Sequence, residues 1–156
     1  MPGRTAAELW PDGFEGGCFC GAVRYRVRAT PRFAYICHCT DCRRVSGTAF
    51  HTGVVVDAAA FDCVAGTPAA FASRADSGHE ITRFHCASCG GALWSRTTAD
   101  LSIVSVKAGT VASVDGDRVR PEKQIWIDSR VEWLSLPAGL ESYRKGLRGA
   151  LPVPTP

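Results

Sequence analysis

Apolar and polar residues alternate strictly over residues 22–28, AVRYRVR. Val23, Tyr25 and Val27 fall on one face, and Arg24, Arg26 and Arg28 fall on the other. A period of two is typical of a β-strand that buries one face, so this segment is predicted to be a half-buried strand.

Similar runs continue along the chain and predict a mainly β domain. Strands are expected over residues 33–37, 50–56, 60–65, 80–85, 92–96, 101–107 and 124–127. Clusters of Gly, Pro, Asp and Ser separate most of them, as in antiparallel sheets. Helix is indicated only just after Cys39 and over Leu140–Leu147. The four tryptophans are interpreted as core or pocket wall.

The 156 residues are predicted to form one domain over 13–147, with an N-terminal extension over 1–12 and a proline-rich, loosely held tail over 148–156. The composition, 46% hydrophobic and 21% charged, is that of a soluble, folded protein. The net charge is only +3, without a block of like charge, so a nucleic-acid partner is not expected. The chain contains no apolar run of transmembrane length, and its start has no signal-peptide pattern, so we expect a cytoplasmic protein that does not enter membranes.

Eight cysteines are the unusual feature of the composition. In a reducing cytosol, clustered thiols are more often metal ligands than disulfides. Cys18 and Cys20 form one short hook, and Cys86 and Cys89 form another. Two ligands from each of two hooks are a common way to enclose tetrahedral zinc. A glycine after each hook favours a tight turn that points backbone N–H groups at sulfur. This set is interpreted as a closed structural zinc site.

The middle cluster, Cys37, Cys39 and Cys42, has an odd number of thiols. Three protein ligands and an open position are typical of catalytic zinc. His38 and Asp41 could supply a fourth ligand, although each is flanked by proposed ligands. Cys63 could also complete the site through space, but we interpret it as a small buried apolar residue on a strand.

The segments GGCFCGAVRYRV, ICHCTDCRRVSGTAF, RFHCASCGGALW and PEKQIWIDSRVEWLSL, together spanning about Gly16 to Tyr143, resemble the GFA family. That family is named for the glutathione-dependent formaldehyde-activating enzyme, S-(hydroxymethyl)glutathione synthase, a carbon–sulfur lyase. The resemblance implies a zinc-containing β-tent fold, a structural zinc on Cys18, Cys20, Cys86 and Cys89, and a second, catalytic zinc on Cys37, Cys39 and Cys42. Gln124 stands where many members have histidine.

A zinc with an open position suits the addition of a small thiol, by default glutathione, to an aldehyde, by default formaldehyde. Such zinc can lower the pKa of a substrate thiol or polarise a carbonyl, and we favour thiol delivery. The thiol's carboxylates need cationic partners, for which Arg43 and Arg44 are the nearest candidates and the 24–28 arginine row is a second possibility. Ser46 and Gly47 could turn N–H groups toward an anion. His38 is either an acid–base group or a hydrogen-bonded structural histidine.

Three other functions remain open at this point. The domain could be a non-catalytic zinc-binding interaction module, or a family enzyme that acts on a different thiol and aldehyde. The middle cluster could also load zinc reversibly or oxidise, as a metal or redox responder does.

Overall fold

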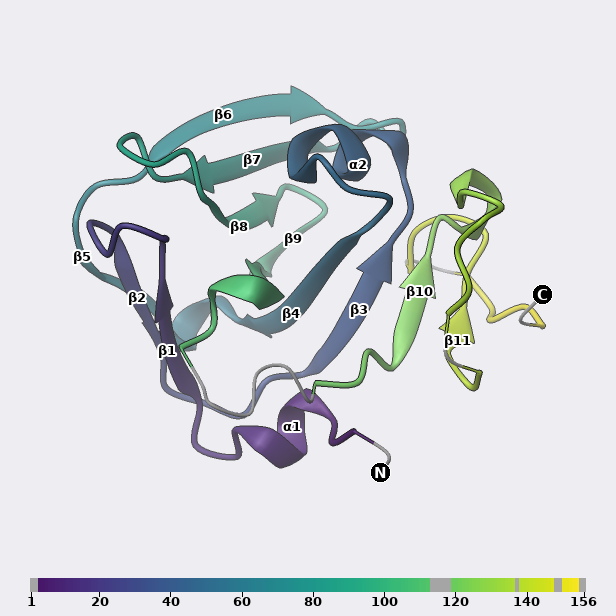
Figure 1. Cartoon of the computed structure of the whole chain (residues 1–156), viewed down its shortest axis with the longest axis horizontal. Helices are drawn as coiled ribbons and strands as arrows, with labels where there is room; N and C mark the ends of the chain where they lie inside the picture. The colour runs from purple at the N-terminus through teal and green to yellow at the C-terminus, as the bar shows by residue number, and fades with distance from the viewer. Residues whose placement is uncertain (1–2, 113–118, 137, 148–149, 155–156) are drawn as a thin grey trace.

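The computed structural model describes residues 3–112, 119–136, 138–147 and 150–154 (Figure 1). Strands dominate, and the helices are short. The α-helices are α1 (Ala6–Leu9) and α2 (Thr40–Ser46), and the 3-10 turns are η1 (Ala58–Ala60), η2 (Ala108–Thr110) and η4 (Ile127–Ser129). The strands are β1 (Phe14–Gly17), β2 (Arg24–Val27), β3 (Phe33–Cys37), β4 (His51–Asp57), β5 (Phe61–Ala65), β6 (Ala69–Arg74), β7 (Glu80–His85), β8 (Ala92–Thr97), β9 (Asp100–Lys107), β10 (Lys123–Ile125) and β11 (Glu141–Ser142).

The strands form two sheets, which confirms the mainly β prediction. A three-stranded sheet has the order β1-β2-β5, and an eight-stranded sheet has the order β11-β10-β3-β4-β9-β8-β7-β6. The expectation of purely antiparallel pairing was wrong, because β10 runs parallel to both β3 and β11. In Figure 1, β10 and β11 lie at the right-hand edge, where the chain returns to β3 after completing the antiparallel strands.

Side-chain alternation gives the large sheet two different faces. One face carries the row Ala34, Val54, Val106, Trp94 and Phe84, which are cross-strand partners from β3 to β7. All five are buried or partly buried in the main core. The opposite face carries the intervening residues of the same strands, among them Tyr35, Gly53 and Lys107. Because successive side chains point to opposite faces, the same strands build a core on one side and a second surface on the other.

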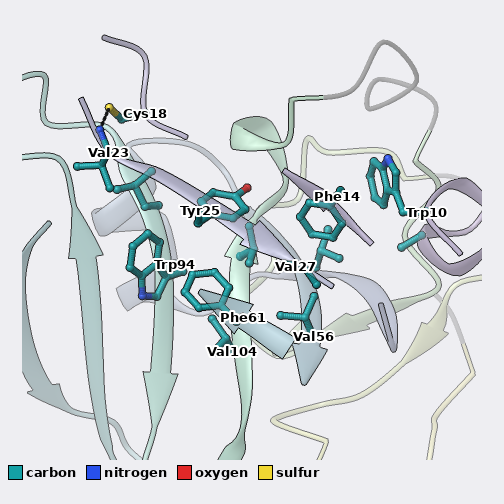
Figure 2. Packing of buried hydrophobic residues seen from close by; sticks show 14 of the residues in the cluster. Trp10, Phe14, Cys18, Val23, Tyr25, Val27, Val56, Phe61, Trp94 and Val104 are labelled. Atoms are coloured by element: carbon teal, nitrogen blue, oxygen red, sulfur yellow. Dashed lines mark hydrogen bonds between the residues drawn. The ribbon is translucent and has the colours of Figure 1, made fainter. Parts of the chain in front are cut away.

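The core lies between the two sheets and is rich in aromatic rings (Figure 2). Tyr25 of β2 stacks on Phe61 of β5 with ring centroids 5.5 Å apart. Phe61 in turn meets Trp94 of the large sheet at 4.9 Å, and Trp94 stacks on Phe84 at 5.3 Å. Trp10, just after α1, packs on Phe14, so the first residues of the chain also contribute to this core.

The predicted strands correspond to β2, β3, β4, β5, β7, β8, β9 and β10, and the turn after Cys39 is α2. The helix expected over Leu140–Leu147 was wrong. This segment forms β11 and turns, because its backbone pairs with β10: the Glu141 N–H donates to the Glu122 carbonyl and the Tyr143 N–H to the Gln124 carbonyl. Tertiary pairing outweighs local propensity here.

Of the predicted tail, residues 148, 149, 155 and 156 lie outside the described part of the chain. Within the tail, the Val153 N–H donates to the Ser142 carbonyl at 2.7 Å. None of the described helices is both long and apolar enough to cross a bilayer.

Candidate metal centres and the cavity beside them

The four outer cysteines converge from two hooks that are far apart in the sequence. Cys18 and Cys20 follow β1, and Cys86 and Cys89 follow β7, yet all four sulfurs lie within 4.8 Å of one another. The Sγ atoms of Cys18 and Cys20 are 3.6 Å apart, and those of Cys20 and Cys86 are 3.7 Å apart. Tetrahedral zinc with bonds of about 2.3 Å needs sulfurs about 3.8 Å apart, so this donor set fits zinc.

Each hook has the turn that its sequence predicts. Gly21 and Gly90 have φ angles of 78° and 71°, in the left-handed region that favours glycine. The Gly21 N–H donates to the Cys18 carbonyl, and the Gly90 N–H donates to the Cys86 carbonyl. The Val23 N–H donates to Cys18 Sγ at 3.3 Å and thereby lowers the pKa of Cys18 to about 6. This contact therefore favours the thiolate form of Cys18, the form in which cysteine binds metal.

The three middle cysteines form a second cluster at the junction of β3 and α2. Cys37 ends β3, Cys39 caps the N-terminus of α2, and Cys42 lies in the first turn, with the three sulfurs within 4.8 Å of one another. The thiols of Cys37 and Cys42 lower the pKa of Cys39, and the Cys42 N–H also donates to its sulfur at 3.2 Å. Three soft donors held this closely fit zinc, and no fourth His, Cys, Asp or Glu joins them among the described residues.

A cavity of about 800 Å³ opens beside this second cluster. All three middle cysteines line it, together with residues of the second face of the large sheet, such as Tyr35, Ser105 and Lys107. Trp126, after β10, and residues 145–147 also line the cavity. Since a drug-sized ligand typically occupies a cavity of this size, the second cluster has room for a substrate, whereas the outer cluster does not line this cavity.

The cavity contains several cationic side chains. Arg32, Arg83, Arg96, Lys107 and Lys145 line it, against the acidic Asp41, Asp76 and Asp100. Arg32 pairs with Asp57 at 2.5 Å. His51 of β4 stays neutral because burial, and secondarily the charge of Lys107, lowers its pKa to about 3.

Comparison with known proteins places this arrangement in a family. The model of the glutathione-dependent formaldehyde-activating enzyme family, GFA, matches residues 13–129, which include all seven clustered cysteines. The chain belongs to the GFA family. No curated protein matches the chain.

A solved structure of a Rhodobacter sphaeroides protein is similar in fold to this GFA-family chain. The TM-score is 0.53 at 20% sequence identity, and the match covers 64% of this chain and 89% of the other. At that identity, the likeness concerns the fold. Family membership and the two cysteine clusters together suggest a zinc-containing enzyme of the GFA type, with carbon–sulfur lyase activity.

Arg43 and Arg44, predicted as substrate contacts because they follow Cys42 directly in the sequence, are not among the described residues that line the cavity. Arg43 Nη1 donates to the Ser129 carbonyl at 3.0 Å and so ties α2 to η4. Ser46 and Gly47 are also absent from the described lining of the cavity. Gly47, with φ 68°, ends α2. A substrate contact by Arg43 or Arg44 therefore stays a prediction, while other cations line the cavity wall.

The second candidate row of arginines lies on the exposed face of β2. Arg26 pairs with Glu15 and Arg28 with Asp62, each at 2.6 Å. Arg24, on the same face, is exposed. This row is a solvated surface remote from the described cavity lining.

His38 points into the protein rather than into the cavity. Its side chain is fully buried, and its Nε2 lies 3.1 Å from Gln124 Oε1. Gln124 Nε2 donates in turn to Ser142 Oγ at 2.8 Å. Gln124 thus joins the second cluster to β11 through a buried chain of hydrogen bonds. Asp41, in contrast, does line the cavity.

Two expectations about burial were wrong. Cys63 is exposed on β5, where its Sγ faces the Ala65 and Gly66 carbonyls, and it belongs to neither cysteine cluster. Cys63 is the middle residue of β5, which is an edge strand of the three-stranded sheet and is exposed beyond Asp62. Trp133 is 75% exposed, so it is neither core nor pocket wall, whereas Trp10 and Trp94 are core and Trp126 lines the cavity.

Sequence reasoning missed His51, Lys107 and Arg83 as cavity residues. A signal was present for Lys107: Ser105 and Lys107 occupy alternate positions of SVK at the end of a mostly apolar strand, which places them on one face. The face itself became assignable only when the strand pairing was known.

Proposed function

We propose that this protein is a zinc-dependent carbon–sulfur lyase-type enzyme that adds a small thiol to an aldehyde. Glutathione and formaldehyde are the default pair, which the family's description supports. The single observation that carries the proposal is the three-cysteine cluster in the wall of a cavity of about 800 Å³. The outer cluster does not line this cavity and suits a structural role.

In the reaction, the sulfur of the thiol forms a bond to the carbonyl carbon. The π electrons of the carbonyl move to oxygen, and the proton that leaves sulfur ends on that oxygen, giving a hemithioacetal. No oxidant or reductant is needed, and the reverse reaction is the lyase direction.

The protein's own residues would contribute in three ways. Cys37, Cys39 and Cys42 would hold zinc at the cavity wall; when bound, zinc supplies a Lewis acid that favours the thiolate form of a nearby substrate thiol. A thiol of pKa about 8.5 is only a few per cent ionised at neutral pH, so full ionisation gains roughly 30-fold in nucleophile concentration. The cavity walls orient the two substrates and limit access of water.

The test compares wild type with Cys39→Ser, using Cys63→Ser as the matched control. Cys63 is an exposed thiol outside both clusters, so its substitution tests the loss of a thiol as such. Exchange NMR would follow free formaldehyde and its glutathione adduct at equilibrium. We expect wild type and Cys63→Ser to accelerate exchange above the buffer rate, and Cys39→Ser to return it to that rate. Equal rates in all three proteins and in buffer would refute the proposal.

A further inference from the structure

Three adjacent strands direct polar side chains that line the cavity over a single glycine. Tyr35 of β3, Gly53 of β4 and Lys107 of β9 are partners in one cross-strand row. A Cβ on Gly53 would lie 2.6 Å from Tyr35 Cε1, 2.8 Å from Ser105 Oγ and 2.9 Å from His51 Nε2. The absence of a side chain at Gly53 therefore lets Tyr35, His51, Ser105 and Lys107 converge, and we call these four residues the Gly53 cluster.

Hydrogen-bond contacts link the members of the Gly53 cluster. The Lys107 ammonium can only donate, and its Nζ lies 3.3 Å from His51 Nδ1 and 3.5 Å from His51 Nε2. The Tyr35 hydroxyl oxygen lies 3.5 Å from His51 Nε2 and 2.7 Å from Ser105 Oγ. Because a neutral imidazole has one acceptor nitrogen, the Lys107 ammonium keeps two hydrogens for other acceptors. When the Tyr35 hydroxyl donates to Ser105 Oγ, the Ser105 hydroxyl hydrogen is available as well.

The positive charge of Lys107 lacks a carboxylate partner. Within the described residues, no Asp or Glu lies at salt-bridge distance from Lys107. Arg83, which is 6% exposed and lines the same cavity, also has no carboxylate partner there: it donates to Ser73 Oγ and lies over the Phe71 ring. Apart from the thiols of the middle cluster, whose charge acts on the partly buried Lys107, no anionic side chain pairs with these two cations among the described residues. Since charges that leave water are normally paired, an anionic ligand would complete the site.

We propose that the Gly53 cluster, with Lys107 and Ser105 as donors, is a carboxylate-binding subsite beside the three-cysteine cluster. The inference rests on the proposed function in one respect: the carboxylate belongs to a substrate of that cavity. His51 of the cluster is the cross-strand partner of Cys37, and the Gly53 row lies two residues further along the strands, a step of about 7 Å. The subsite therefore favours a thiol or aldehyde whose carboxylate lies within a few bonds of the reacting atoms over the default pair, glutathione and formaldehyde.

A carboxylate at this distance from the three-cysteine cluster can belong to either reactant. It can belong to a short thiol such as 3-mercaptopropionate, or to an oxo acid such as glyoxylate. Each has a neutral amide of nearly the same shape, 3-mercaptopropionamide and glyoxylamide. The two acid–amide pairs therefore separate the contribution of the charge from that of the rest of the ligand.

The experiment measures the dissociation constants of all four compounds by titration calorimetry on the full-length, zinc-loaded protein. We expect the acid of at least one pair to bind about tenfold more tightly than its amide, the usual size of a charge-assisted contact. The pair that shows the preference identifies which reactant carries the carboxylate. Lys107→Met should abolish the preference, whereas Arg144→Met should retain it. Arg144 is an exposed arginine that pairs with Asp128 outside the cavity lining, so it controls for the loss of one positive charge.

Gly53→Ala is a second variant, for the case that Lys107→Met does not fold. It keeps every charge but fills the space over which the cluster converges, so it should also remove the preference. The proposal is overturned if wild type binds neither acid more tightly than its amide, or if a folded Lys107→Met or Gly53→Ala protein keeps the preference. A carboxylate preference without thiol–aldehyde exchange would leave this subsite standing and refute the proposed function. Thiol–aldehyde exchange without a carboxylate preference would support the proposed function and overturn this subsite.

Discussion

Removing one of the two outer hooks tests how far the fold depends on the structural metal centre. Substituting both Cys86 and Cys89 by serine leaves Cys18 and Cys20 with no partners from the other hook. Cys86 is 1% exposed, and its Sγ lies 3.7 Å from that of Cys20 although the two residues are 66 positions apart. The double substitution therefore cuts a cross-link between distant segments while leaving the aromatic core intact.

The expected loss of stability follows from the separation of the two hooks along the chain. Closing a loop of 66 residues in the unfolded chain is worth about 4 kcal/mol by the chain-entropy estimate for cross-links. Complete loss of a structural zinc costs on the order of 10 kcal/mol in small zinc domains, which have almost no other core. Because this protein has a large aromatic core, we expect the double substitution to reduce the free energy of unfolding by about 4 kcal/mol, the smaller of the two estimates. At about 2–4 °C per kcal/mol for a chain of this size, the melting temperature should fall by about 8–16 °C.

The assay combines zinc content by mass spectrometry with thermal unfolding by circular dichroism. Cys63→Ser is the control, because it removes a thiol that belongs to neither cluster. We expect the control to keep wild-type zinc content and melting, and the double variant to lose about one zinc per chain as well as the stated stability. A double variant that melted within about 2 °C of wild type would refute the cross-link reasoning, whatever its zinc content.

Three further predictions concern the second cluster and the core. Mild chelation should remove zinc from the Cys37, Cys39 and Cys42 site first, since three protein ligands hold an ion less firmly than four; loss of both ions together with the circular dichroism signal would contradict this. Gln124→Ala should reduce the free energy of unfolding by about 2–4 kcal/mol in denaturant titrations, because it removes two buried hydrogen bonds and leaves His38 Nε2 without its partner; an unchanged midpoint would show that these bonds contribute nothing. Trp94→Ala should cost about 3–5 kcal/mol in the same titration, whereas Trp133→Ala, at an exposed position, should change stability by less than about 0.5 kcal/mol; similar losses at both tryptophans would contradict the observed burial.

The sequence by itself determined the features that depend on short separations along the chain. The alternation in AVRYRVR predicted β2, with its arginines outside. The spacing within each hook, followed by Gly21 or Gly90, predicted turns that present thiols in pairs, and both glycines have the expected positive φ. The three cysteines around the start of α2 belong to one strand end and one helical turn, so their proximity also follows from local geometry. Local spacing was sufficient in each case because a few fixed backbone angles set the distance between these side chains.

The tertiary structure alone decided the features that depend on strand pairing. The residues 140–147 are apolar enough at intervals to suggest a helix, yet their pairing with β10 makes them a strand and turns. The sequence pattern predicts that Cys63 is a buried residue of a strand. However, β5 is an edge strand, and Cys63 is exposed on it. Arg43 and Arg44 adjoin the second cluster in sequence and do not line its cavity, whereas Lys107 is 65 positions from Cys42 and does. Neighbours in sequence can point to opposite sides of one element, while the register of β3, β4 and β9 brings Tyr35, Gly53 and Lys107 together. The metal ligands could thus be predicted from the sequence, but the residues that would meet a substrate could not, because only the pairing of distant strands brings them to the same face.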